Sequence, residues 1–184
     1  MLDIVVAALA MVLVVSGVLK VRDPESAIPM LAAVGLPVGR AAVYAVSLAE
    51  ILVGAVALVI GGPVATAALA LLYAAFAVVS LVLLRSGDTV SCGCFGQRSA
   101  PMTPLHVGVN ALAAVVASAA AALGAPGLYA TTDDRSLVVV ALATLAAVLL
   151  AAVIVGLLTG VAGRIVAPRR SHPAASSGAS DVAE

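Results

Sequence analysis

The sequence predicts an all-α, polytopic membrane bundle of five transmembrane helices. Hydrophobic residues make up 64% of the 184 residues and charged residues only 10%, whereas soluble domains average about 45–50% apolar and about 25% charged residues. The apolar residues fall in long runs without period-two alternation, which favours helices over a β-barrel. Nine Lys and Arg balance nine Asp and Glu, so a nucleic-acid partner is not expected.

Five apolar runs are long enough to cross a hydrocarbon core of about 30 Å at about 1.5 Å per residue. They cover residues 2–19, 41–60, 64–84, 105–123 and 137–161. No Lys or Arg precedes the first run, as it would in a cleaved signal peptide, so we expect this run to be a retained helix.

The breaks between the runs have turn chemistry. Gly61-Gly62-Pro63 predicts a short antiparallel hairpin. Prolines interrupt the segment 21–40, where we expect a short interfacial helix around 26–34. The predicted organisation is a core over 1–123, a loop and additional transmembrane helix over 124–166, and a disordered cytoplasmic tail over 167–184.

The basic residues predict the orientation of the chain. With five spans, one face collects eight of the nine Lys and Arg and the other carries only Arg135; the eight are Lys20, Arg22, Arg40, Arg85, Arg98, Arg164, Arg169 and Arg170. The positive-inside rule then predicts an external N-terminus and a cytoplasmic C-terminus. We expect a multi-pass protein of the cell (inner or plasma) membrane, with the loop between the third and fourth runs in the cytoplasm.

That loop carries the two cysteines of the chain, Cys92 and Cys94. Cα atoms two positions apart are separated by at most about 7 Å, and a disulfide needs about 4.4–6.8 Å, so the pair can close if Gly93 lets the backbone bend. Such a small ring is strained, which makes the disulfide labile and exchangeable. An Arg85 or Arg98 side chain close to a sulfur would stabilise the thiolate.

The same loop has alternative interpretations. Two thiolates can bind a metal together with His106 and the more distant His172, a thin ligand set for zinc that suits Cu(I) better. The thiols could also be incidental. We expect thiol chemistry and no resident metal. Gly61-Gly62 is a turn, and no G-x-G-x-x-G follows a strand, so neither a nucleotide partner nor a resident cofactor is expected.

Several polar residues lie within the apolar runs or directly after one. Glu50 lies roughly 13 Å into its run, where an ionisable group serves either proton uptake or an interhelical hydrogen bond. Lys20 shares a helix face with Ser16, four positions earlier. This lysine could stabilise a thiolate, pair with Glu50 or extend along the helix to the membrane surface. Asn110 could hydrogen-bond across the bundle.

Together these residues resemble the MauE family, the methylamine-utilisation membrane proteins related to the DoxX-like group. The resemblance spans about 1–123, implies a four-helix core, and is silent on the fifth helix and the tail. It is carried by Ser16, Gly17, Lys20, Asp23 and Pro24, by Glu50 and Gly54, by Cys92-Gly93-Cys94-Phe95-Gly96, and by Asn110.

The resemblance implies a thiol–disulfide oxidoreductase or an assistant to one. It implies maturation of a disulfide-rich exported enzyme such as methylamine dehydrogenase, beside a thioredoxin-like partner. The reacting residues would be Cys92 and Cys94. The supporting residues would be Ser16, Lys20, Asp23, Glu50, Arg85, Gly93, Phe95, Gly96 and Asn110.

The cysteine count predicts a partner. One dithiol holds two electrons and the chain has no further cysteine, so electrons pass to a partner protein's thiols or to a quinone in the lipid. A cytoplasmic loop conflicts with maturation outside the cell. Either the protein delivers reducing equivalents from the cytoplasm, or the loop enters the membrane, or the charges belong to the site. The alternative function is a non-enzymatic membrane subunit whose loop binds a metal or docks a partner.

Overall fold

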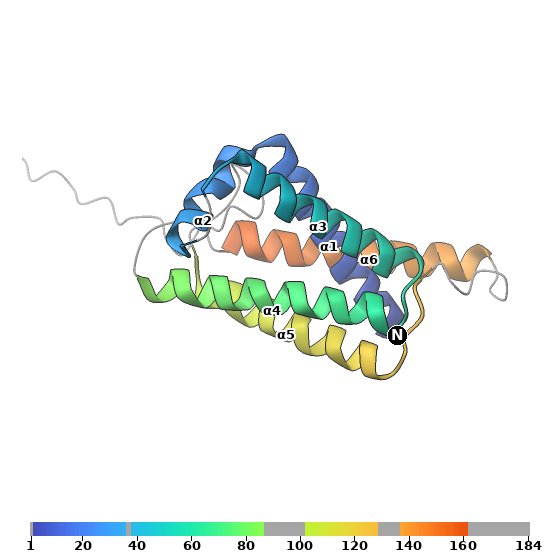
Figure 1. Cartoon of the computed structure of the whole chain (residues 1–184). Helices are drawn as coiled ribbons and strands as arrows, with labels where there is room; N and C mark the ends of the chain where they lie inside the picture. The colour runs from blue at the N-terminus through green and yellow to red at the C-terminus, as the bar shows by residue number, and fades with distance from the viewer. Residues whose placement is uncertain (1, 36–37, 87–101, 129–136, 162–184) are drawn as a thin grey trace, which may run out of the picture.

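The computed structural model describes residues 2–35, 38–86, 102–128 and 137–161. Five long helices run along the bundle in Figure 1 and are apolar and long enough to cross a membrane. They confirm the predicted all-α membrane bundle, and each coincides with one predicted run. The helices are α1 (Leu2–Arg22), α3 (Arg40–Val59), α4 (Gly62–Ser86), α5 (Pro104–Ala122) and α6 (Leu137–Gly156), the last continued by the π-helical turn η4 (Leu157–Val161).

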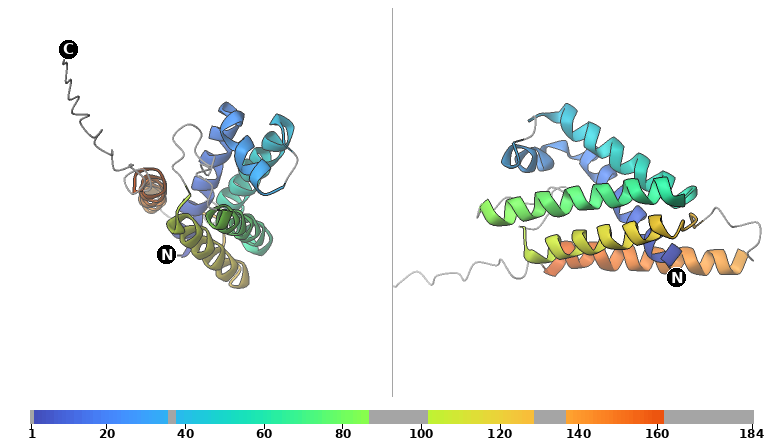
Figure 2. Two further views of the ribbon diagram at one scale, coloured as in Figure 1. Left: turned by 90° about the vertical axis from the view of Figure 1, so that its left-hand side faces the viewer. Right: turned by 60° about the horizontal axis from the view of Figure 1, so that its bottom comes forward.

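Helix α1 is the central element of the bundle. It contacts α3, α5 and α6, while α4 and α5 form the other closely packed pair. Half of the α1 span is buried, compared with 11% of the α6 span. Figure 2 shows α6 beside this core rather than within it. Polar residues on α1 are therefore the ones that the fold carries into the interior.

Two glycines bring α1 and α3 into close contact. A Cβ atom added at Gly17 would lie 2.7 Å from the Ser47 carbonyl oxygen and 2.8 Å from Cγ1 of Ile51. A Cβ atom added at Gly54 would lie 2.8 Å from the Ala10 carbonyl oxygen. Small residues at such positions let membrane helices approach until their backbones touch. This contact sets the register in which the polar residues of the two helices meet.

An apolar core fills the space between α1, α4 and α5. Its fully or nearly fully buried members include Leu9, Leu13, Leu69 and Ala117. The Tyr73 hydroxyl, from α4, donates a hydrogen bond of 2.7 Å to the Leu9 carbonyl oxygen of α1. A buried phenol needs such a partner because its unsatisfied hydroxyl group would cost stability in an apolar interior.

The two short turns at one end of the bundle are joined to each other. Gly61 and Gly62 have φ angles of +66° and +82° and form the hairpin between α3 and α4 that the sequence predicts. The Gly62 amide donates to the Ala125 carbonyl oxygen at 2.9 Å, and the Gly127 amide donates to the Ile60 carbonyl oxygen at 3.2 Å. These hydrogen bonds tie the α3–α4 turn to the segment that follows α5.

The opposite end carries the short helix expected around 26–34. It is a 3-10 turn, η1 (Pro24–Ala27), continued by α2 (Ile28–Ala33). Ala27, Met30 and Leu31 are buried against Val43, and the cluster includes Leu83, with partly buried Met102 packed on it. The two residues Leu83 and Met102 flank the cysteine-containing segment. The predicted tail over 167–184 lies outside the described residues.

Replacing Gly17 by Ala tests the close contact between α1 and α3. The added methyl group meets a backbone oxygen that cannot move without displacing α3, so the free energy of unfolding should fall by about 1–3 kcal/mol. Thermal unfolding in detergent measures this change. The matched control is Gly108→Ala on α5, where a Cβ meets nothing within 4 Å. Equal stability of the two variants would contradict the close packing.

Candidate functional site

A buried ion pair joins α1 to α3. The Lys20 Nζ atom lies 2.5 Å from Oε1 of Glu50, and the two side chains are 1% and 0% exposed. The same ammonium group donates a hydrogen bond of 2.7 Å to Oγ of Ser16, one turn earlier on α1. The structure therefore brings together three residues that the sequence singled out, and Lys20 points into the bundle rather than extending toward its surface.

The local sequence explains how the lysine reaches the glutamate. Side chains on a helix lean toward its N-terminus, so the Lys20 side chain runs back over the turn that holds Ser16 and Gly17. A Cβ atom at Gly17 would lie 3.1 Å from the Glu50 Cβ atom. Because Gly17 has no side chain, Glu50 occupies that space and its carboxylate meets the ammonium group.

An aromatic ring completes the surroundings of Lys20. Its Nζ atom lies 5.3 Å from the centroid of the Phe76 ring on α4. A cation at this distance from a ring face gains an electrostatic attraction that grows when water is excluded. No sequence pattern predicts that Phe76 lies over the lysine. What sets this residue apart in the sequence is only that the chain has two phenylalanines.

One oxygen of the glutamate has no partner in the part of the chain that the structure describes. Oε1 of Glu50 accepts from Lys20, while Oε2 is buried and makes no hydrogen bond. A carboxylate oxygen has lone pairs for more than one donor, and a buried polar atom without a partner is destabilising. The free oxygen is thus a vacant acceptor inside the bundle.

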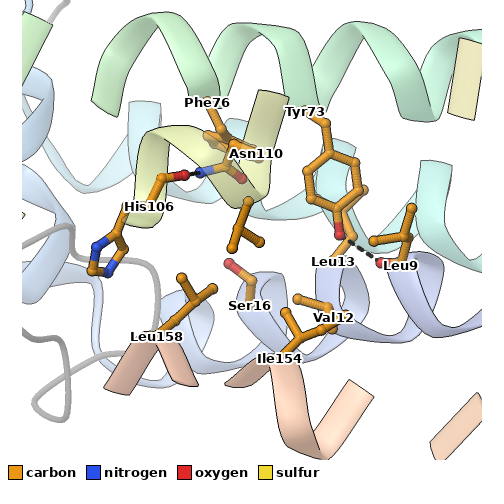
Figure 3. Close-up of a pocket in the computed structure, with 11 residues that line it drawn as sticks. Leu9, Val12, Leu13, Ser16, Tyr73, Phe76, His106, Asn110, Ile154 and Leu158 are labelled. Atoms are coloured by element: carbon orange, nitrogen blue, oxygen red, sulfur yellow. Dashed lines mark hydrogen bonds between the residues drawn. The ribbon is translucent and has the colours of Figure 1, made fainter. Parts of the chain in front are cut away.

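A small cavity of about 30 Å³ adjoins this cluster. Figure 3 shows that Ser16 points from α1 into the space bounded by α4, α5 and α6, with Asn110 above it and Leu158 beside it. The polar residues on its lining are Ser16, Tyr73, His106 and Asn110. Most of the lining is apolar, but the volume suffices for a water molecule, and Ser16 and Asn110 are polar neighbours of the kind that a buried water needs.

Asn110 and His106 lie on successive turns of α5. The Asn110 amide nitrogen donates to the His106 carbonyl oxygen at 2.9 Å and, over a long 3.4 Å, to Oγ of Ser80 on α4. The second contact is the cross-bundle hydrogen bond that the sequence suggested. His106 Nδ1 lies 2.9 Å from Oγ1 of Thr103 and accepts from the Thr103 amide at 3.3 Å, which forms a capping box at the start of α5.

This arrangement bears on the metal interpretation. Nδ1 of His106 is occupied by the cap, and the imidazole is buried at 2% exposure. Within the described ranges no group of three or more His, Cys, Asp or Glu side chains could hold a metal ion. His172 lies outside those ranges. The described part of the chain therefore offers no support for a site built on His106.

The cysteine motif itself lies outside the described residues. Cys92, Gly93, Cys94, Phe95 and Gly96 fall between Ser86 and Met102. Its flanks are placed, because Leu83 and Met102 pack with α2. The final turn of α4 carries Arg85, which is exposed. The structure thus anchors the two ends of the motif's segment to the end of the bundle where α1 finishes with Lys20 and Arg22.

Asp23 follows directly after α1. Its carbonyl oxygen accepts a hydrogen bond of 2.8 Å from Oγ of Ser26, which stabilises the turn into η1. Its Oδ2 atom is buried and has no partner among the described residues. The structure does not bring Asp23 into hydrogen-bonding contact with Lys20 or Glu50, and its role here is at the turn.

The ion pair makes a testable prediction about stability. Lys20→Met alone leaves the Glu50 carboxylate buried and unpaired, which should lower the free energy of unfolding by about 3–5 kcal/mol. The double variant Lys20→Met, Glu50→Leu removes both charges and should recover most of that loss. Thermal unfolding in detergent compares the three proteins. A double variant as unstable as the single one would show that the pair is not energetically coupled.

One comparison with known proteins finds a family for this chain. A family model described as "Methylamine utilisation protein MauE" matches residues 1–125. The match includes α1, α3, α4 and α5, the ion pair and the cysteine motif, and it excludes α6. No curated protein and no solved structure matches the chain. Because the family model covers more than half of the sequence, this chain belongs to the MauE family of membrane proteins.

Proposed function

We propose that this protein supports thiol–disulfide exchange through Cys92 and Cys94. The observation that carries the proposal is the Cys-Gly-Cys-Phe-Gly motif, the only cysteine-containing segment of the chain, within the region that the family model matches. Glycine between the cysteines permits a small, strained and therefore exchangeable ring.

The exchange balances without a resident cofactor. One cysteine, as thiolate, attacks a disulfide of a thioredoxin-like partner and forms a mixed disulfide. The second cysteine then attacks this bond, closing Cys92–Cys94 and releasing the partner as a dithiol. Two electrons and two protons pass from this chain to the partner, and the reverse sequence oxidises the partner. The physiological setting we propose is maturation of a disulfide-rich exported enzyme such as methylamine dehydrogenase.

We propose a disulfide of a partner protein, rather than a quinone, as the electron acceptor. A groove of about 580 Å³ runs between α1 and α6 and is lined only by apolar or small side chains, including Met11, Val15 and Val155. Such a lining suits a lipid acyl chain. It supplies no side-chain hydrogen-bond donor for a quinone ring, which binding sites of this kind need to fix orientation.

A trapping experiment tests the exchange. Cys94→Ser should accumulate a mixed disulfide between Cys92 and the partner, because the resolving thiol is missing. Non-reducing gels and mass spectrometry after acid quenching detect the adduct, and added dithiothreitol should dissolve it. The matched control is the Cys92→Ser, Cys94→Ser double variant, which can form no adduct. If Cys94→Ser traps no partner and the double variant retains full activity in cells, the loop is not an exchange site. Stoichiometric metal in the purified protein would then favour the metal-binding alternative.

The orientation is tested separately. In the described residues, Lys20, Arg22, Arg40 and Arg85 lie at one end of the bundle, where α1 and α4 finish and α3 begins. The positive-inside rule places this end in the cytoplasm. A membrane-impermeant maleimide should therefore label the cysteines only after the cells are permeabilised, with or without prior reduction. Labelling in intact cells after reduction alone would put the loop outside and reverse the orientation.

A further inference from the structure

Burying the Lys20–Glu50 pair carries a desolvation cost. Charged groups within a membrane span are unfavourable and generally mark a functional pathway. Replacement of a buried ion pair by apolar residues of similar volume is often neutral for stability. The close approach of α1 and α3 follows from Gly17 and Gly54, so the fold does not need the charges to bring these helices together.

The geometry leaves room for one more proton or donor at this pair. Lys20 donates to Ser16 and to Oε1 of Glu50. Oε2 of Glu50 is buried without a hydrogen-bond partner in the described structure. A carboxylate held at one oxygen and vacant at the other can accept a proton without losing its lysine contact.

A route for that proton runs through Ser16. The Ser16 hydroxyl contacts the lysine and also lines the cavity of about 30 Å³. The side chains of Ser16 and Asn110 both line this cavity (Figure 3), so a water molecule bound there would have both as polar neighbours. A hydroxyl group both donates and accepts, so it can pass a proton between that water and the ion pair.

The groups that face this cluster come from four helices. Lys20 on α1 is charged, and α4 contributes Phe76. Across the cavity α4 also contributes Tyr73 and α5 contributes His106 and Asn110, while the apolar Ile154 comes from α6 and Leu158 from η4. Within the described structure Lys20 is the charged residue that contacts Glu50.

We infer that Glu50 is a proton-binding site within the membrane, reached by water through the cavity, with Lys20 and Ser16 as positioning residues. The inference rests on the proposed function only for the reaction that uses this proton, which is thiol–disulfide exchange. In each of the two exchange steps the attacking thiol gives up one proton, Glu50 holds it, and the departing partner thiolate takes it, so two protons pass to the partner together with the two electrons.

Infrared difference spectroscopy of the full chain in lipid nanodiscs tests the site. A carbonyl band of a protonated carboxylic acid should appear reversibly on acidification, shift in D₂O and vanish in Glu50→Gln. Ser16→Ala should keep the band but slow its exchange in D₂O by about tenfold, since one hydrogen-bonded relay is lost. If Glu50→Gln does not fold, the Lys20→Met, Glu50→Leu variant serves as the subtraction.

The outcomes separate this inference from the proposed function. A band that persists unchanged in both Glu50 variants, or no titrating band in the wild type, overturns the proton site and leaves the pair structural. The Cys92→Ser, Cys94→Ser variant should retain the titrating band, because the site does not contain the thiols. Failure to trap a partner, with the band present, would refute the thiol role and leave the proton site intact.

Discussion

The ion pair between Lys20 and Glu50 is the constraint on which the arrangement of the site depends. Two opposite charges removed from water must meet closely, because either one alone would be strongly destabilising inside the bundle. The close contact of α1 and α3 at Gly17 and Gly54 sets the register in which the two charges meet, and Gly17 leaves the space that Glu50 occupies. Once α1 is fixed, Ser16 faces the cavity and Tyr73 reaches the Leu9 carbonyl oxygen. The polar groups of the interior are thus arranged around α1.

Much of the fold was predictable because a membrane imposes simple rules. A span needs a long apolar run, so residues 105–123 predicted α5 to within one residue at each end. The turn at Gly61 and Gly62 was predictable because positive φ angles favour glycine. The spacing of Ser16 and Lys20 put both on one face, as observed.

The remaining features arise from contacts between distant segments, which no local pattern encodes. Phe76 faces Lys20 only because α4 packs beside α1 at that height. The cavity needs Leu158 from η4, at the end of a helix that neither the resemblance nor the family match covers. His106 was considered as a metal ligand, while its ring caps α5 through Thr103. The role of His106 is decided by the groups that surround its ring in the folded chain, and these come from the fold rather than from a local sequence pattern.

The hydrogen bonds between the two turns at the glycine end have a mechanical consequence. Gly62 with Ala125, and Gly127 with Ile60, connect the α3–α4 hairpin to the segment after α5. At the other end, α4 and α5 are held by their own packing, by the hydrogen bond between Asn110 and Ser80, and by Leu83 and Met102 against α2. Both ends of the described bundle are therefore cross-linked between segments far apart in the sequence. The cysteine-containing segment thus starts and finishes on a rigid frame, which limits how far its two ends can separate when the two thiols react.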